Sequence, residues 1–174
     1  MSNHPIYVLD ASVFIEAKKR YYAFDIAPPF WDALVNQASR GRLLSIDRVK
    51  DEIERGNDVL VDWANGQFHN WFASTAQDDV IKAYRDIITW VNNQSQFAGA
   101  AKAEFADEKN ADGWVIAYAQ AKRCVVVTEE KFNPDRKKKV LIPNGCREFS
   151  VECIDTFGML RDMGVRFTEW TILR

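Results

Sequence analysis

The chain has 174 residues and a formal net charge of −2; 47% of its residues are hydrophobic and 28% are charged. This balance is typical of a single globular domain with its own core, and it excludes a disordered chain. The small net charge excludes a protein that is basic throughout, although a local basic patch can still attract phosphate.

The cysteines and the N-terminus indicate a reduced compartment and no membrane. Cys124, Cys146 and Cys153 are odd in number and contain no C-x-x-C pair, so they fit neither a disulfide framework nor a zinc site. The N-terminus lacks the charged and apolar regions of a signal peptide, and no apolar run has the length of a membrane span. We therefore expect a cytoplasmic protein without membrane contact.

Short apolar runs alternate with stretches of helical periodicity along the whole chain. In chain order the predicted elements are a strand at 6–9, helices at 11–22 and 30–40, a strand at 43–46, a helix between Asp47 and Gly56, helices at 59–72, 78–92 and 110–123, strands at 124–128 and 140–142, a helix at 151–163 and a strand at 165–168.

The alternation of strands and helices predicts an α/β fold, with a three-layer α/β/α arrangement around a mostly parallel sheet. The chain shows no internal repeat and no linker, so we expect one domain over residues 1–174. The stretch 58–105 has helical patterns without a clear strand. It is expected to form a helical insertion against one edge of the sheet.

Acidic residues follow the two most apolar strands. Asp10 comes directly after the first strand, and Thr128, Glu129 and Glu130 follow the strand at 124–128. In an open parallel sheet, ligands bind at the carboxyl ends of the strands, so these side chains are expected to meet there. Ser12, where the next helix begins, has a hydroxyl that could bond a backbone amide or orient Asp10.

Two more acids can reach the same end of the sheet, since Glu52 lies in the helix after the second strand and Asp112 begins a later helix. Carboxylates at close range repel each other unless a cation neutralises them, and hard oxygen ligands suit Mg²⁺ or Mn²⁺. Such an ion activates water and stabilises charge on a phosphate, which indicates phosphodiester hydrolysis.

Each acid also has a simpler interpretation. Asp112 could serve only as a helix cap, Glu52 could be a solvated surface residue, and Glu129 and Glu130 could form a turn without a function. A phosphatase that used Asp10 as its nucleophile would usually need a second Asp two residues later. Ser12 occupies that position and is a poor proton donor.

Four ordered motifs resemble those of the PIN-domain family, which includes the VapC-type toxins of bacterial toxin–antitoxin pairs. The segment Tyr-Val-Leu-Asp-Ala-Ser-Val-Phe-Ile at 7–15 is similar to the first motif, and Val-Lys-Asp-Glu-Ile at 49–53 to the second. Ala-Asp-Gly-Trp-Val-Ile-Ala-Tyr-Ala at 111–119 is similar to the third. Val-Val-Val-Thr-Glu-Glu-Lys-Phe at 125–132 is similar to the fourth, in which the family usually has Asp where Glu130 stands.

The resemblance implies a PIN-like fold and an endoribonuclease that cuts single-stranded RNA with Mg²⁺ or Mn²⁺. Its acids would be Asp10, Glu52, Asp112 and Glu130, with Glu129 as an alternative fourth ligand and Ser12 and Thr128 in support. VapC-type members are held in check by a cognate antitoxin and commonly form homodimers. The Glu at the fourth position and the long 58–105 segment indicate a divergent branch, and a non-catalytic module that binds RNA or protein is the alternative.

Two further stretches are candidates for contacts with RNA. The basic run consists of Arg136, Lys137, Lys138 and Lys139. It could grip phosphates near the acids, or it could simply form a solvated loop. The aromatic residues Trp63, Phe68, Trp71 and Phe72 could stack bases or form an interface, but packing in the core is the expected role.

Overall fold

A computed structural model of the chain describes residues 4–168, so residues 1–3 of the N-terminus discussed above and residues 169–174 lie outside the description. Its five strands form one parallel sheet in the order β3-β2-β1-β4-β5. They are β1 (Tyr7–Leu9), β2 (Leu43–Ile46), β3 (Phe72–Ala73), β4 (Val125–Val127) and β5 (Cys153–Ile154).

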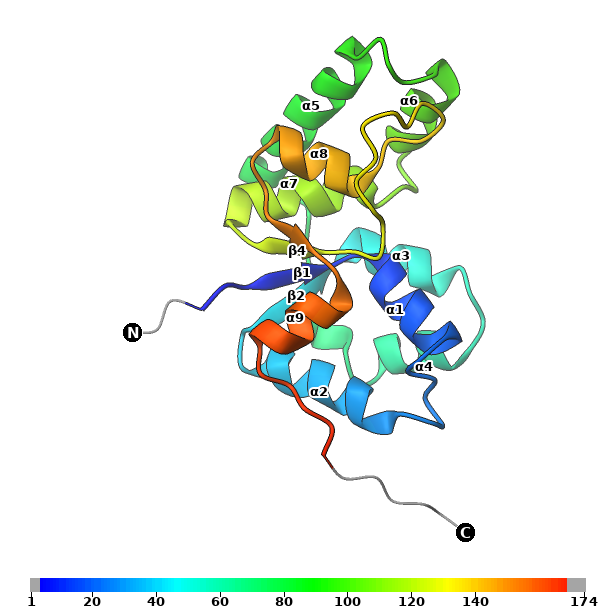
Figure 1. The fold of residues 1–174 in the computed structure, drawn as a ribbon, viewed down its shortest axis with the longest axis vertical. Helices are drawn as coiled ribbons and strands as arrows, with labels where there is room; N and C mark the ends of the chain where they lie inside the picture. The colour runs from blue at the N-terminus through cyan, green and yellow to red at the C-terminus, as the bar shows by residue number, and fades with distance from the viewer. Residues whose placement is uncertain (1–3, 169–174) are drawn as a thin grey trace.

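Helices cover both faces of this sheet, so the predicted three-layer α/β/α fold is confirmed. One face carries α1, α2, α4 and α9, and the other carries α5, α7 and α8 (Figure 1). The helices are α1 (Ala11–Lys19), α2 (Pro28–Ser39), α3 (Asp47–Glu54), α4 (Val59–Asn65), the 3-10 turn η1 (His69–Trp71), α5 (Asp78–Asn93), α6 (Gly99–Phe105), α7 (Asp112–Lys122), α8 (Ile142–Glu148) and α9 (Thr156–Asp162). None of the helices within residues 4–168 is long and apolar enough to cross a membrane.

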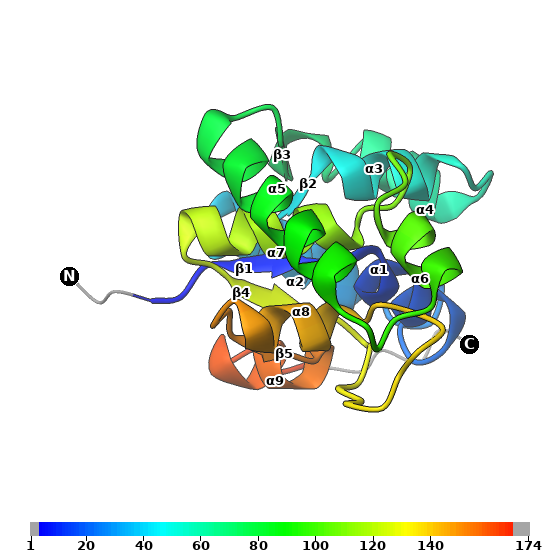
Figure 2. The same cartoon turned by 90° about the horizontal axis from the view of Figure 1, so that it is seen from above.

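The direction in which the chain adds strands reverses next to β1. From β1 the chain adds β2 and β3 on one side, and it then returns to place β4 and β5 on the other side, as Figure 2 shows from above. Tyr7 is in register with Leu43 of β2 and with Val125 of β4. The carboxyl ends of β1 and β4 therefore border the crevice where open α/β sheets bind ligands.

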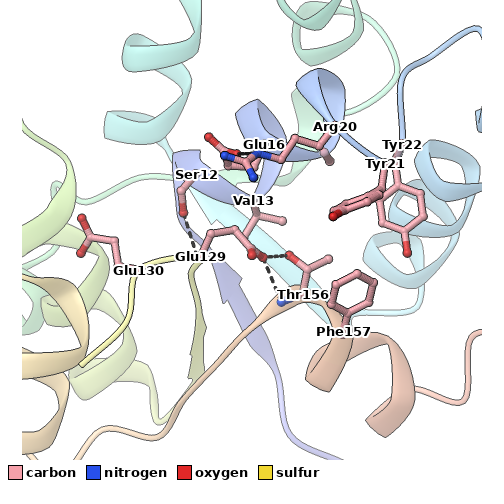
Figure 3. Close-up of a pocket in the computed structure, with 11 residues that line it drawn as sticks. Ser12, Val13, Glu16, Arg20, Tyr21, Tyr22, Glu129, Glu130, Thr156 and Phe157 are labelled. Carbon is pink, nitrogen blue, oxygen red and sulfur yellow. Dashed lines mark hydrogen bonds and ion pairs between the residues drawn. The ribbon is translucent and has the colours of Figure 1, made fainter. Parts of the chain in front are cut away.

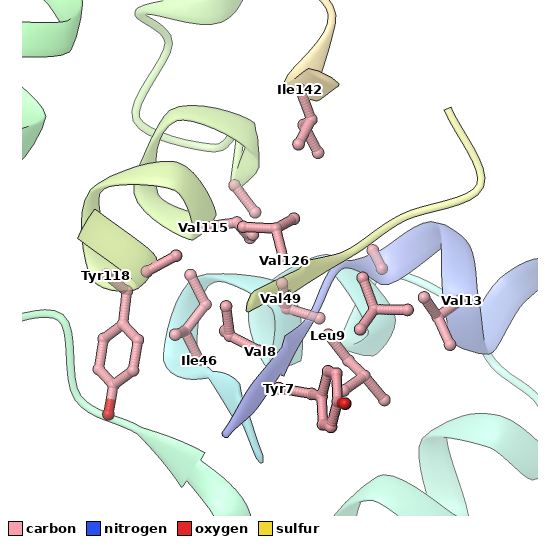
Figure 4. Packing of buried hydrophobic residues seen from close by; sticks show 14 of the residues in the cluster. Tyr7, Val8, Leu9, Val13, Ile46, Val49, Val115, Tyr118, Val126 and Ile142 are labelled. Carbon is pink, nitrogen blue, oxygen red and sulfur yellow. The ribbon is translucent and has the colours of Figure 1, made fainter. Parts of the chain in front are cut away.

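The two central strands are buried along their whole length, as expected for a sheet covered on both faces. Every residue of β1 and of β4 is buried. Figure 4 shows Val8 and Val126 packed with Val115 of α7 on one side and Val49 of α3 nearby. Because these strands cannot shift without opening the core, the residues that follow them are held firmly.

The aromatic residues of 59–72 belong to the core, which confirms their expected role. Trp63 and Phe68 are buried and stack at 4.8 Å between ring centroids, while Trp71 and Phe72 pack against the core from its edge. The prediction of one helix over 59–72 is wrong, however. Helix α4 ends at Asn65, and the segment then forms η1 and the edge strand β3. The 58–105 segment is therefore not purely helical.

Three predictions in the C-terminal part are also wrong. No strand forms at 140–142, because Ile142 begins α8 with Pro143 in its first turn, where proline costs no hydrogen bond. The helix predicted over 151–163 contains strand β5 and starts only at Thr156, with Asp155 as its cap. The residues predicted as a strand at 165–168 take no regular structure.

Candidate functional site

Asp10 is fixed at the end of β1 by both central strands. Its side chain is only 4% exposed. The Oδ2 atom accepts hydrogen bonds from Ser12 Oγ at 2.6 Å and from Thr128 Oγ1 at 3.1 Å. The backbone N–H of Asp10 donates to the Val127 carbonyl at 3.0 Å. The carboxylate is thus positioned before any ligand arrives.

Ser12 and Thr128 connect this carboxylate to the segment after β4. Ser12 Oγ donates to Asp10 and accepts from the Glu129 N–H at 3.0 Å, so the two roles considered for it coexist. Thr128 Oγ1 likewise bonds Asp10 and accepts from the Glu130 N–H at 3.2 Å. The hydroxyls therefore hold the backbone of both glutamates in place relative to Asp10.

The two glutamates point to opposite sides, as Figure 3 shows. Glu129 Oε1 accepts hydrogen bonds from the hydroxyl and the N–H of Thr156, where α9 begins. Glu130 Oε2 instead accepts from the Ile142 N–H at 2.8 Å, where α8 begins. Glu129 is therefore bound to α9, whereas the charge of Glu130 raises the pKa values of the other acids.

Asp112 is the first residue of α7, and its carboxylate makes no capping bond. Burial raises its pKa well above the ordinary value, and the charges of Asp10 and Glu130 raise it further. Capping alone therefore does not explain this residue. The negative charges of the other acids act on its carboxylate.

Asp10 and Glu52 show the same mutual influence. Burial raises the pKa of Asp10, the bond from Ser12 lowers it, and the charge of Glu130 raises it again. The pKa of Glu52 in α3 is raised by burial and then by the charge of Asp10. Four acids thus lie close enough for their charges to interact at the carboxyl ends of β1 and β4: Asp10, Glu52, Asp112 and Glu130. A fully solvated Glu52 would keep its ordinary pKa.

Lys139 brings a positive charge into this group. Its Nζ lies 2.5 Å from Glu130 Oε1 and 3.9 Å from Asp112 Oδ2. Burial alone would lower the pKa of Lys139, but the bond to Glu130 and the charge of Asp112 outweigh it and keep the pKa above its ordinary value. The rest of the basic run, Arg136 to Lys138, is exposed. Lys139 therefore differs from its neighbours in pointing inward.

The loop that carries Lys139 is held from the far side by the connection between α5 and α6. Gln96 Nε2 donates to the carbonyls of Pro134 at 2.6 Å and Arg136 at 2.9 Å. The Ala98 N–H donates to the Lys137 carbonyl at 2.9 Å. These bonds fix the backbone immediately before Lys139.

The residue types at this site fit a divalent metal ion, but their present arrangement is neutralised by lysine. Carboxylate oxygens are the preferred ligands of Mg²⁺ and Mn²⁺. Burial is the main cause of the raised pKa of Asp112, and the charges of Asp10 and Glu130 raise it further. Within residues 4–168, no three acidic, histidine or cysteine side chains are already grouped to hold a metal. An ion would take the place of the Lys139 ammonium.

A family model described as a domain of unknown function, DUF4411, matches residues 7–167. The chain belongs to the DUF4411 family. No curated protein and no solved structure matches it. The match to DUF4411 begins in β1 and extends past α9, so the matched region of this chain contains every acid of the site and Lys139.

Sequence reasoning missed two features of this DUF4411 chain. It treated Lys139 as one more residue of the basic run, although the buried Val140 directly after it was a signal that the chain turns inward here. It also missed a cavity of about 400 Å³ beside the acids, between α1, the segment after β4 and α9. No single sequence motif marks that cavity, because its walls come from three distant segments.

Proposed function

We propose that this protein is a metal-dependent endoribonuclease that hydrolyses phosphodiester bonds of single-stranded RNA. One observation carries the proposal: the charge of Glu130 raises the pKa values of the buried acids Asp10, Glu52 and Asp112 at the carboxyl ends of β1 and β4. The order of the motifs that contain these acids, with its resemblance to the PIN-domain family, supports the same reaction. A bound Mg²⁺ or Mn²⁺ would activate water and stabilise the charge that develops on the phosphate.

The residues of the chain would position the reaction. Asp10 and Asp112 would supply the central oxygen ligands, and Ser12 and Thr128 keep Asp10 from rotating. Glu52 and Glu130 would complete the negative site from either side. Lys139, once displaced from Glu130, would remain near enough to neutralise a phosphate oxygen, in the way that fixed positive charges stabilise phosphoryl transfer.

Cleavage of single-stranded RNA in Mg²⁺ or Mn²⁺ tests the proposal when wild type is compared with Asp10→Asn. The variant keeps the shape of the side chain but removes its charge, so we expect cleavage to slow on the order of 100-fold or more. Asp51→Asn is the matched control, because Asp51 is an exposed acid in α3 next to Glu52. If Asp10→Asn cuts as fast as wild type, the site is not catalytic.

A second candidate function is a non-catalytic module that binds RNA or a protein partner. Lys139 is the observation that favours it, because a lysine already neutralises Glu130 and Asp112 without a metal ion. Calorimetric titration with Mn²⁺ separates the two functions. Absence of binding at millimolar Mn²⁺ would favour the module over the enzyme.

The likeness to VapC-type motifs extends the proposal to a biological role, the toxin of a toxin–antitoxin pair. Its partners would be RNA, a cognate antitoxin and a second copy of the chain as a homodimer. A small regulator encoded next to this chain, whose product blocks RNA cleavage, is the expected observation. Cleavage that no neighbouring gene product inhibits would instead indicate an RNA-processing enzyme.

A further inference from the structure

The cavity of about 400 Å³ lies directly beside the acidic site and shares residues with it. Ser12, Glu129 and Glu130 form its wall toward the acids, and α1 and the start of α9 form the remainder. Its volume falls within the range of about 300–1,000 Å³ that is usual for small-molecule sites. A ligand in this cavity would therefore lie next to the phosphate that is bound at Asp10 and Asp112 under the proposed function.

The side of the cavity away from the acids is aromatic. Tyr21, Tyr22 and Phe157 gather there, with Phe157 centred 6.5 Å from Tyr21 and 6.4 Å from Tyr22 (Figure 3). Tyr21 is 71% exposed and Phe157 is 41% exposed, which is unusual for large aromatic rings without a binding role. Tyr21 and Phe157 therefore lie on the surface, and Tyr22 lies between them and the core.

The aromatic wall is held in place by the core beneath it. Tyr22 stacks on the buried Phe30 with 4.2 Å between ring centroids and an interplanar angle of 3°. The buried residues Val13 and Ala17 of α1 provide an apolar floor. Tyr22 and the apolar floor are therefore already in place before a flat apolar ligand enters, and such preorganisation strengthens binding.

Charge determines which part of a nucleotide fits here. Glu129 and Glu130 line the wall toward the acids, and Glu16 on α1 is a third carboxylate, paired with Arg20. Arg20 also lines the cavity, but it is paired with Glu16, so the remaining carboxylates repel a phosphate and offer acceptors to the N–H groups of a base. The phosphate belongs at the neighbouring acids, where a metal ion would receive it.

We propose that this cavity binds the unpaired base of the nucleotide next to the RNA bond that is cut, with the base against Tyr21, Tyr22 and Phe157. Stacking on aromatic rings tolerates any base, since every base has a π-face. The cavity admits a base only when it is splayed out of a helix, so it selects single-stranded over double-stranded RNA. The inference rests on the proposed function, because the acids beside the cavity must bind the phosphate.

Photo-crosslinking tests the position of the base. Single-stranded RNA octamers that contain 4-thiouridine are irradiated with the full-length Asp10→Asn variant, which leaves the RNA intact, and the crosslinked peptides are identified by mass spectrometry. We expect crosslinks in Tyr21, Tyr22 or Phe157. Crosslinks confined to other segments would overturn the inference.

Variants test the contribution of the rings to RNA binding, measured by fluorescence anisotropy in the same Asp10→Asn background. Tyr21→Ala and Phe157→Ala are each expected to weaken binding roughly tenfold, as for loss of one stacked base. Tyr21→Phe keeps the ring and should bind normally. Val59→Ala is the matched control, because Val59 is an exposed apolar residue of α4 outside the cavity.

The outcomes separate this inference from the proposed function. If wild type cuts RNA but the alanine variants bind it normally, the nuclease stands and the base site is wrong; a cavity that receives a side chain of a protein partner would give this result. If the chain neither binds nor cuts RNA, both the proposed nuclease function and the base site are wrong. Loss of binding in the alanine variants together with crosslinks to the rings supports both.

Discussion

Lys139 places a positive charge within the group of acids, where the proposed metal ion would also bind. Buried carboxylates that face one another cost free energy, and an ammonium placed among them lowers that cost. Lysine carries one positive charge, whereas Mg²⁺ and Mn²⁺ carry two and accept several oxygen ligands at once. If the proposed metal ion binds here, we expect it to compete with the lysine for the carboxylates.

Lys139→Met is expected to have opposite effects on stability and on metal binding. Removal of the charge should lower the free energy of unfolding of the metal-free protein by about 1 kcal/mol, a modest figure because the lysine side chain is 36% exposed. Mn²⁺ should bind more tightly, since no ammonium competes with it. Urea unfolding and calorimetry measure the two quantities.

Lys138→Met is the matched control, because Lys138 is exposed and belongs to the same basic run. It should change neither quantity appreciably. A Lys139→Met protein that binds Mn²⁺ no better than wild type would show that the lysine does not compete with metal.

The raised pKa of Asp112 predicts how stability depends on pH. In the folded protein this carboxyl keeps its proton at pH values where the unfolded chain, near the ordinary value of 3.8, has lost it. The protonated Asp112 therefore contributes most to stability below pH 3.8, and this contribution is lost as the pH rises through the raised pKa. Above it, wild type carries a charge that is costly to bury.

Asp112→Asn removes this dependence. In the presence of a chelator, we expect the variant to become increasingly more stable than wild type as the pH rises from the ordinary value of 3.8 through the raised pKa of Asp112. Thermal unfolding at a series of pH values measures the difference. A difference that stays constant with pH would mean that the carboxyl titrates normally, and saturating Mn²⁺ should reverse the order by stabilising wild type.

Among the elements, those with strong periodicity were predicted well. The unbroken apolar runs of β1 and β4 indicated strands covered on both faces. Helix α5 has one apolar side, and α7 is apolar and buried on most of its surface. Because these elements place Asp10, Asp112 and the segment after β4, the position of the candidate site could be predicted from them. Its internal geometry could not, since it depends on side-chain rotamers.

The elements that were missed are too short to show a pattern. Strands β3 and β5 have two residues each, and they exist because a longer strand already present offers them hydrogen bonds. Neither Phe72–Ala73 nor Cys153–Ile154 differs from its surroundings in sequence. The direction of Glu129 was unpredictable for a similar reason, because its partner Thr156 begins a helix that the sequence placed several residues too early.

Close contact between α5 and α7 leads to a prediction at the element scale. A Cβ atom at Gly113 would lie 3.0 Å from Tyr84 Cε2 and 3.1 Å from Phe105 Cε1, which is too close. We expect Gly113→Ala to lower the free energy of unfolding by about 1–3 kcal/mol, as overpacking does, and to displace Asp112. Urea unfolding measures the loss.

Gly99→Ala is the control for this substitution. Nothing lies within 4 Å of a Cβ at Gly99, the first residue of α6, and alanine favours a helix. This variant should be as stable as wild type or slightly more so. Equal effects of the two substitutions would contradict the proposed close packing of α7.

For the whole molecule, a single buried cluster links elements from β1 to α9. Residues of the 58–105 segment, such as Phe68 and Ile87, belong to it as fully as Val8 does. We therefore expect this segment to unfold together with the sheet in one cooperative transition. Calorimetry should give equal calorimetric and van't Hoff enthalpies; two separate transitions would show that the segment folds as an independent unit.

The bonds from Gln96 and Ala98 to the loop before Lys139 give the connection between α5 and α6 a further importance. This connection acts as a spacer that sets how far the lysine reaches toward the acids. A deletion or insertion of one residue there would advance or withdraw the ammonium while every carboxylate stayed where it is. We therefore expect the affinity of the proposed metal site to depend on the length of this surface connection, although the connection itself makes no contact with the acids.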